Sequence, residues 1–125
     1  MSNFKLKSLT PMLETPDVER TVTFYTEVLG FTAENYSKVQ QWASLERDRV
    51  TIMFSVPNAH RNMPAPIMSG SLYINTDNVD ALWDELKDRC KICYPIENFS
   101  YGMREFGVYD NNGYLIQFGQ EIRSS

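Results

Sequence analysis

Glu14-Thr-Pro-Asp-Val-Glu19 and Asn75-Thr-Asp-Asn-Val-Asp80 are two versions of one short stretch, and they lie 61 residues apart in the chain. Each copy follows a strand-like run and opens a segment whose apolar residues have helical spacing. Self-similarity at a fixed spacing is typical of an internal repeat. The stretch therefore divides the chain into two similar halves.

The segment after each copy predicts one helix. The first helix is expected from about Asp17 to Leu29, and its apolar stripe consists of Val18, Val22, Tyr25, Val28 and Leu29. The second is expected from about Val79 to Cys90, and its stripe consists of Val79, Leu82, Trp83, Leu86 and Cys90. Asp17, and Asn78 or Asp77, carry oxygens that can cap the first turns, and Gly30 can end the first helix.

One strand is expected before each helix and about three after it. The ranges are 9–14, 31–37, 40–46 and 49–56 in the first half, and 71–75, 92–97, 103–109 and 114–119 in the second. Asp110-Asn-Asn-Gly113 is a strong turn signal between the last two strands. The sequence predicts an α+β fold of two tandem βαβββ modules in one domain over 1–125, with modules at about 6–56 and 71–121 and a linker at 57–70.

Composition excludes several classes of function. The 125 residues carry a net charge of −4, and no basic stretch is long enough to grip phosphates, so nucleic acid is not an expected partner. Residues 1–10 lack the apolar core of a signal peptide, and no run approaches about 18 apolar residues, so a membrane is not expected either. A cytoplasmic location is the resulting expectation.

Strand alternation sorts the side chains into two faces. The more apolar face should pack on the helices. The other face mixes hydroxyls, amides, methionines, tyrosines and carboxylates, with Met53, Tyr73, Glu105 and Gln117 among them. This mixture is typical of the lining of a ligand cavity, although a face buried against a partner chain or a loop would have a similar composition.

Two motifs add a family resemblance. Phe24-Tyr-Thr-Glu-Val-Leu-Gly-Phe31, and Tyr101-Gly-Met-Arg-Glu-Phe106 ahead of the Asp110–Gly113 turn, together resemble the glyoxalase/bleomycin-resistance/extradiol-dioxygenase family, also called the vicinal oxygen chelate superfamily. The resemblance covers nearly the whole chain. It implies an open, mixed β-barrel-like sheet around a cavity, often in a dimer. The bleomycin-resistance branch is the most similar, with Tyr101 where that branch usually has Trp.

The resemblance also locates the metal ligands of the metal-dependent members. Those positions, which are mostly His or Glu in the family, fall here on Thr10, Met53, Ser71 and Gln117. Hydroxyls and a thioether are poor ligands for Zn²⁺, Ni²⁺ or Fe²⁺, and only the Gln117 carbonyl could bind one. We therefore expect no metal at these positions and no other cofactor.

A cavity without metal favours binding over catalysis. We expect the chain to bind or sequester a small, flat aromatic or cationic molecule, because aromatic rings stack on heterocycles and attract cations. The candidate ligand-binding residues are Met12, Trp42, Met53, Tyr73, Tyr101, Met103, Glu105, Tyr109 and Gln117. The alternative for Trp42 is core or dimer packing, and for the methionines it is the filling of irregular core space.

Two other functions stay open. One is a metal-independent, glyoxalase-like lyase or isomerase in which Glu105 or Glu14 acts as general base. The other is a non-catalytic structural dimer. The expected partners are a small molecule and a second copy of the chain, and the sequence leaves open whether one chain or two enclose the cavity.

Overall fold

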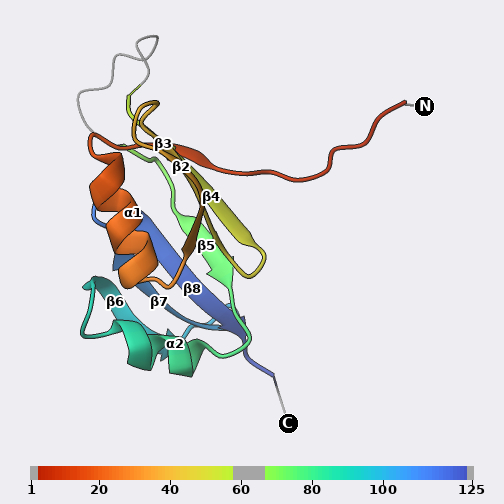
Figure 1. Cartoon of the computed structure of the whole chain (residues 1–125). Helices are drawn as coiled ribbons and strands as arrows, with labels where there is room; N and C mark the ends of the chain where they lie inside the picture. Colours follow the sequence, from red (N-terminus) through yellow and green to blue (C-terminus); the bar gives the residue numbers. More distant parts are fainter. Residues whose placement is uncertain (1–2, 58–66, 124–125) are drawn as a thin grey trace.

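Each half of the chain folds as one βαβββ unit in the computed structural model, which describes residues 3–57 and 67–123 (Figure 1). The first module contains β1 (Met12–Glu14), α1 (Val18–Glu27), β2 (Thr32–Ser37), β3 (Trp42–Arg47) and β4 (Val50–Ser55). The second contains β5 (Leu72–Asn75), α2 (Val79–Leu86), β6 (Lys91–Asn98), β7 (Met103–Tyr109) and β8 (Leu115–Glu121). The predicted α+β fold of two such modules is confirmed. Most of the predicted linker, with His60, lies outside the described residues.

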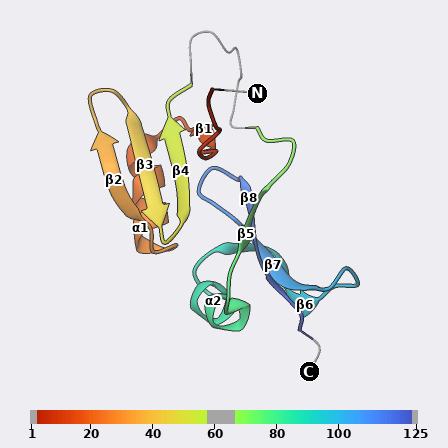
Figure 2. The same ribbon diagram turned by 90° about the vertical axis from the view of Figure 1, so that its right-hand side faces the viewer.

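The two modules have the same sheet topology. The strand orders are β1-β4-β3-β2 and β5-β8-β7-β6, and the first pair in each sheet is parallel. Figure 2 shows α1 behind the first sheet and the second sheet beside it. The registers repeat as well, because Met12 pairs with Met53 in one sheet as Tyr73 pairs with Gln117 in the other.

The helix ends follow the predicted local chemistry. The Asp17 carboxylate accepts from the Arg20 N–H at 2.9 Å, and the Asn78 side chain accepts from the Ala81 N–H at 3.1 Å. Gly30 follows α1 with a φ of 74°, a conformation that costs glycine little. No helix in the described part of the chain is long and apolar enough to cross a membrane.

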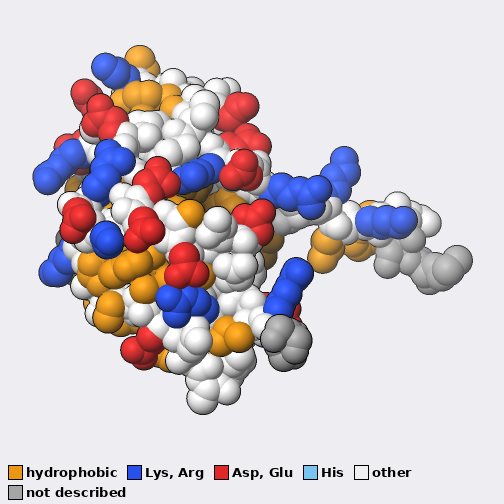
Figure 3. Space-filling model, turned by 90° about the horizontal axis from the view of Figure 1, so that it is seen from below, with side chains coloured by type: hydrophobic (Ala, Val, Ile, Leu, Met, Phe, Trp, Pro, Cys, Tyr) orange, Lys and Arg blue, Asp and Glu red, His pale blue; other side chains and the backbone are white. Residues whose placement is uncertain are grey.

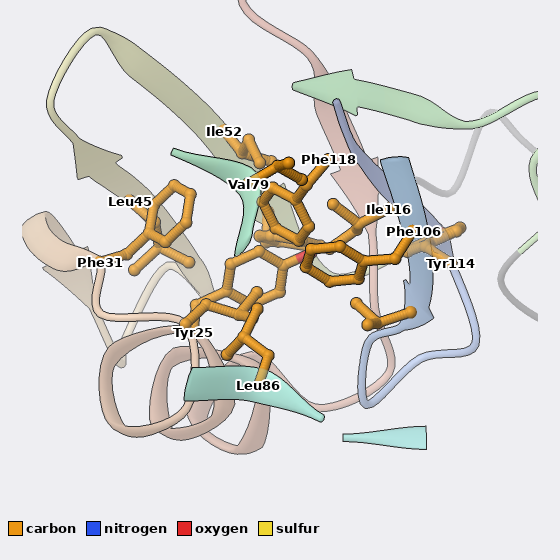
Figure 4. Packing of buried hydrophobic residues seen from close by; sticks show 13 residues of the cluster. Tyr25, Phe31, Leu45, Ile52, Val79, Leu86, Phe106, Tyr114, Ile116 and Phe118 are labelled. Carbon is orange, nitrogen blue, oxygen red and sulfur yellow. The ribbon is translucent and has the colours of Figure 1, made fainter. Parts of the chain in front are cut away.

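Buried residues of both modules form one hydrophobic cluster between the helices and the sheets (Figure 4). Tyr25 of α1 is fully buried and lies 5.0 Å, centroid to centroid, from the Phe54 ring of its own module. Its hydroxyl donates to the Asp110 carboxylate of the second module at 2.7 Å. Burial raises the pKa of Asp110, and hydrogen bonds from Tyr25 and from backbone N–H groups of the turn oppose that rise.

The first strand is shorter than predicted. β1 begins at Met12, whereas the sequence indicated a start at Leu9, and the Leu9 side chain is exposed. Pro11 explains the difference, because it accepts from the Met53 N–H but has no N–H to continue the ladder. Residues 3–11 instead form an extended stretch that leaves the body of the molecule (Figure 1).

Candidate ligand-binding site

A buried carboxylate on the second sheet is the centre of the candidate site. Glu105 lies in the middle of β7, on the face that alternates with the core residues Phe106 and Val108. Its side chain is only 1% exposed. A buried carboxylate is costly unless it is hydrogen-bonded, so its partners decide its charge state.

Tyrosines from two other strands of the same sheet hold this carboxylate. Tyr73 of β5 donates its hydroxyl proton to Glu105 Oε1 at 2.9 Å, and Tyr94 of β6 donates to Oε2 in a short hydrogen bond. The Gln117 amide on β8 donates to the Tyr94 hydroxyl at 2.9 Å and lies 3.5 Å from Glu105 Oε2. Both oxygens of the carboxylate therefore have donors, and neither of these donors is a cation.

Two glycines make room for these tyrosines. A Cβ at Gly119, opposite Glu105 on β8, would overlap the Tyr73 hydroxyl. A Cβ at Gly107, two residues along β7 from Glu105, would lie 2.5 Å from a ring carbon of Tyr94. Real Cβ atoms do not approach so closely, so each glycine lets a tyrosine lie flat across its strand and reach Glu105.

The hydrogen bonds keep Glu105 ionised. Burial on its own raises the pKa of this carboxyl group, but hydrogen bonds from Tyr94, Tyr101 and Tyr73 outweigh burial and hold the pKa below its usual value. The pKa values of the tyrosines shift in the opposite direction. Burial and the bond to Glu105 raise the pKa of Tyr73 to about 12, and the same two causes raise the pKa of Tyr94. At neutral pH the cluster is one carboxylate among neutral phenols.

A pocket of 280 Å³ opens beside this cluster. Its lining consists of Tyr94, Pro95, Glu97, Phe99, Tyr101, Glu105 and Gln117. The Phe99 ring stands edge-on to Tyr94, with centroids 5.6 Å apart and planes at 89°, and stacks on Tyr101 at 5.5 Å and 12°. The lining has two carboxylates and no Lys or Arg. Aromatic walls with excess negative charge suit a cationic or flat aromatic ligand.

The structure brings together part of the predicted set. Tyr101, Glu105 and Gln117 line the pocket, and Tyr73 lies against Glu105. Met103 and Tyr109 lie at the two ends of β7 and do not line it, and the Tyr109 ring faces the Lys91 ammonium at 5.5 Å.

The other predicted residues lie in the first module. Met12 and Met53 are paired neighbours on β1 and β4, and Trp42 is on β3, opposite Ser55. None of these three lines the pocket of the second sheet. Glu14 ends β1, and its backbone carbonyl accepts from the Tyr114 hydroxyl at 2.6 Å.

Several residues of the site were not predicted from the sequence. They are Tyr94, Pro95, Glu97, Phe99, Gly107 and Gly119. The two glycines had a readable signal, since a glycine inside a strand marks a close approach by another group. Tyr94 lies in a strand with two register shifts, at Ile92/Tyr94 and Tyr94/Glu97, so simple alternation did not indicate which face its side chain occupies.

The four positions that correspond to family metal ligands do not form a donor set for a divalent metal. The Ser71 hydroxyl donates to the Gln117 carbonyl oxygen, which is the best potential ligand among the four. Met53 offers a thioether beside Met12, and Thr10 offers a hydroxyl. Within residues 3–57 and 67–123, no group of three or more His, Cys, Asp or Glu side chains could hold a metal ion. These residues do not fit a metal centre.

A model of the Glyoxalase/Bleomycin resistance protein/Dioxygenase superfamily matches residues 8–118, which is most of the chain. The chain belongs to this superfamily. The resemblance indicated by the two sequence motifs is thus confirmed, and it extends through both modules. A comparison of the chain with curated proteins found no match.

Solved structures share the fold of this superfamily member at low sequence identity. A protein of unknown function from Agrobacterium tumefaciens str. C58 is 18% identical with a TM-score of 0.76, and the match covers 96% of this chain and 98% of that one. A glyoxalase/bleomycin resistance protein/dioxygenase from Nocardioides is 16% identical with a TM-score of 0.76, over 99% and 89%. TioX from Micromonospora sp. ML1 is 18% identical with a TM-score of 0.72, over 93% and 99%.

Proposed function

We propose that this superfamily member binds a small cationic or flat aromatic molecule in the pocket beside Glu105, without a metal and without turnover. The observation that carries the proposal is a carboxylate kept ionised by phenol donors in a pocket that contains no Lys or Arg. This carboxylate has hydrogen bonds but no counter-ion among residues 3–57 and 67–123. A bound cation would supply the missing positive charge.

The tyrosines strengthen this attraction. A phenol that donates its proton to a carboxylate is polarised, because linked hydrogen bonds shift electron density along the chain of donors. The Tyr94 ring therefore presents a more negative face to the pocket. A cation over such a face gains about 0.5–2 kcal/mol, more as water is excluded. The exposed Glu97 carboxylate on the rim adds a second negative charge.

The size of the pocket limits what it can hold. Its 280 Å³ is at the lower end of the roughly 300–1,000 Å³ typical of small-molecule sites. It can take one ring system or one cationic head group of a larger molecule. A larger ligand would need further walls, and the outer face of the first sheet has side chains suited to that purpose at Met12, Trp42 and Met53.

We propose that a second copy of the chain supplies such walls in a homodimer. Apolar side chains around both outer faces are exposed, with Met12 at 50% and Tyr101 at 63%. The stretch 3–11 exposes Phe4, Leu6 and Leu9, and Figure 3 shows it projecting with basic and hydrophobic side chains. Apolar surface of this kind marks protein interfaces, and the basic arm suits an acidic partner of net charge −4.

The lyase alternative is less well supported. A general base works best with a pKa near neutrality, whereas hydrogen bonds hold the pKa of Glu105 below its usual value. Glu105 is also enclosed by its donors and only 1% exposed, so a substrate proton would not reach it directly.

Calorimetric titration tests the binding proposal. N-methylquinolinium is the cationic probe, and quinoline at pH 8 is the neutral probe of nearly the same shape. We expect the cation to bind wild type with 1:1 stoichiometry and to bind Glu105→Gln about tenfold more weakly. A tenfold loss of affinity corresponds to about 1.4 kcal/mol of binding free energy. Equal affinity of both probes, or of wild type and Glu105→Gln, would contradict the proposal.

Two further measurements complete the test. Elemental analysis of protein purified without chelators should find no stoichiometric transition metal, and a metal at one equivalent would overturn the metal-free part of the proposal. Light scattering during size exclusion should give twice the chain mass of 14.5 kDa. A Leu6→Asp/Leu9→Asp variant should shift the protein toward monomer, and a monomeric wild type would refute the dimer.

A further inference from the structure

The two modules differ in the length of one hairpin. In the second module, Tyr109 pairs with Leu115, which leaves a loop of five residues, 110–114. In the first module, Arg47 pairs with Val50, which leaves a loop of only two residues, Asp48 and Arg49. The hairpin loop of the second module is therefore three residues longer than that of the first. Each of these hairpins faces the helix of the other module.

The longer hairpin closes the space at the start of α1. Thr15 donates to the Asn112 side chain at 2.7 Å, and the amides of Asn111 and Asn112 donate to the Thr21 hydroxyl at 3.0 and 3.1 Å. Together with the Tyr25–Asp110 bond, these contacts fill the junction between the modules on that side.

The shorter hairpin leaves the corresponding junction open. A cleft of 490 Å³ lies between the hairpin of the first module and α2 of the second. Its floor is apolar and includes Ile74, Leu82 and Phe118, and none of its lining residues lines the pocket beside Glu105. Figure 3 shows acidic and basic side chains interspersed over the underside of the molecule, with hydrophobic surface between them.

The walls of this cleft carry opposite charges. Ala81 and Glu85 are four residues apart and so share the face of α2 that forms one wall, and Asp77 lines the same cleft just before the helix begins. Arg49 belongs to the opposite wall. Its guanidinium has no hydrogen bond or ion pair to any residue that the structure describes, and the same holds for the Asp77 and Glu85 carboxylates.

The neighbouring polar groups are already used within the fold. Arg47 donates to the Leu29 carbonyl at 2.6 Å, so it is fixed against its own module. At the start of α2, the Val79 N–H donates to Gln120 and the Ala81 N–H to Asn78. The helix terminus is thus satisfied. Asp48 also lines the cleft, and it lies 4.0 Å from Arg47. Among the described lining residues, the charged groups without a charged partner are Arg49 on one wall and Asp77 and Glu85 on the other.

We propose that this cleft is a second ligand site, for a small zwitterion with an apolar side chain, of the class of aliphatic amino acids and short apolar peptides. The carboxylate of the ligand pairs with Arg49, and its ammonium pairs with Asp77 or Glu85. Its apolar side chain covers Leu82 and Ile74, where a longer hairpin would otherwise lie. The volume of 490 Å³ is within the range of small-molecule sites.

Amide NMR spectra of the full chain, titrated with L-leucine and L-leucyl-L-leucine, test this site. The expected result is a saturable shift of the amides of Arg49, Val50, Ala81 and Leu82. N-acetyl-L-leucine lacks the ammonium and isoamylamine lacks the carboxylate, so each should bind about three- to fivefold more weakly, as for the loss of one partly exposed ion pair. Equal binding of all four probes, or no saturable shift at about 10 mM, would overturn the proposal.

Variants separate the cleft from other surfaces. Arg49→Gln should weaken L-leucine binding about three- to fivefold, and Ala81→Phe, which fills the cleft from an exposed helix position, should abolish it. Asp84→Asn is the matched control, because Asp84 lies on the same helix but pairs with Lys87 at 3.3 Å, and it should bind normally. Unchanged binding in both cleft variants, with native spectra elsewhere, would refute the site.

Discussion

Tyr94→Phe is the most informative single change in the protein. It keeps the ring that stands edge-on to Phe99 and removes only the hydroxyl that donates to Glu105 and accepts from Gln117. A hydrogen bond to a charged group contributes about 1.5–3 kcal/mol. We therefore expect the free energy of unfolding to fall by about 2 kcal/mol at pH 7. The pKa of Glu105 should rise by about one unit or more, since one unit corresponds to about 1.4 kcal/mol.

The stability difference between wild type and Tyr94→Phe should depend on pH. The folded-state pKa of Glu105 is below the reference value of 4.5, so its hydrogen bonds stabilise the fold fully above pH 4.5. That contribution is lost as the pH falls through the lowered pKa, where the carboxylate is protonated in both states. The difference between wild type and Tyr94→Phe should accordingly shrink in acid, to about 1 kcal/mol for a neutral hydrogen bond.

Urea unfolding at neutral and acid pH measures both quantities, and a carbon NMR titration of the Glu105 carboxyl reports its pKa. Tyr36→Phe is the matched control, because the Tyr36 hydroxyl has no hydrogen bond to any described residue. It should unfold within about 0.5 kcal/mol of wild type. A pH-independent loss in Tyr94→Phe, or an unchanged pKa of Glu105, would refute the assignment of Tyr94 as a donor that keeps Glu105 ionised.

Three other predictions concern the same fold. Gly119→Ala should cost about 1–3 kcal/mol in urea unfolding because its Cβ overlaps the Tyr73 hydroxyl, whereas Gly70→Ala, with nothing within 4 Å, should be neutral. Asp110→Ala should cost at least about 2 kcal/mol, because it removes the acceptor of the buried Tyr25 hydroxyl; a loss below 0.5 kcal/mol, about the size of a surface substitution, would contradict that role. The raised pKa of Tyr73, about 12 against 10.0, stabilises the fold below pH 10 and loses that effect as the pH rises through 12. Phenolate absorbance should show the late titration, and a Tyr73 that titrates near 10 would contradict it.

Local signals in the sequence predicted the modules well. The caps at Asp17 and Asn78, the turn at Asp110–Gly113 and the alternation of Phe106 and Val108 with Glu105 each depend on residues close together in the chain. The structure adds the order of the strands, which is the same in both sheets.

The composition of the site was harder to predict, because it depends on which faces meet. Alternation correctly separated core from outer face, but Met12 and Met53 lie on the outer face of the first sheet and do not line the pocket of the second sheet. The bulged strand β6 concealed Tyr94, since two register shifts break the two-residue period on which the prediction depends. The lowered pKa of Glu105 was also not predicted, because three tyrosines from outside β7 supply its hydrogen-bond donors.

The central claim is that the aromatic pocket beside Glu105 holds a cation, and nuclear Overhauser contacts test it most directly. In a saturated complex with N-methylquinolinium, the N-methyl protons should contact the ring protons of Tyr94 and Phe99, and these contacts should weaken in Glu105→Gln. Contacts only to residues outside the pocket lining, or contacts of equal strength in Glu105→Gln, would contradict the account.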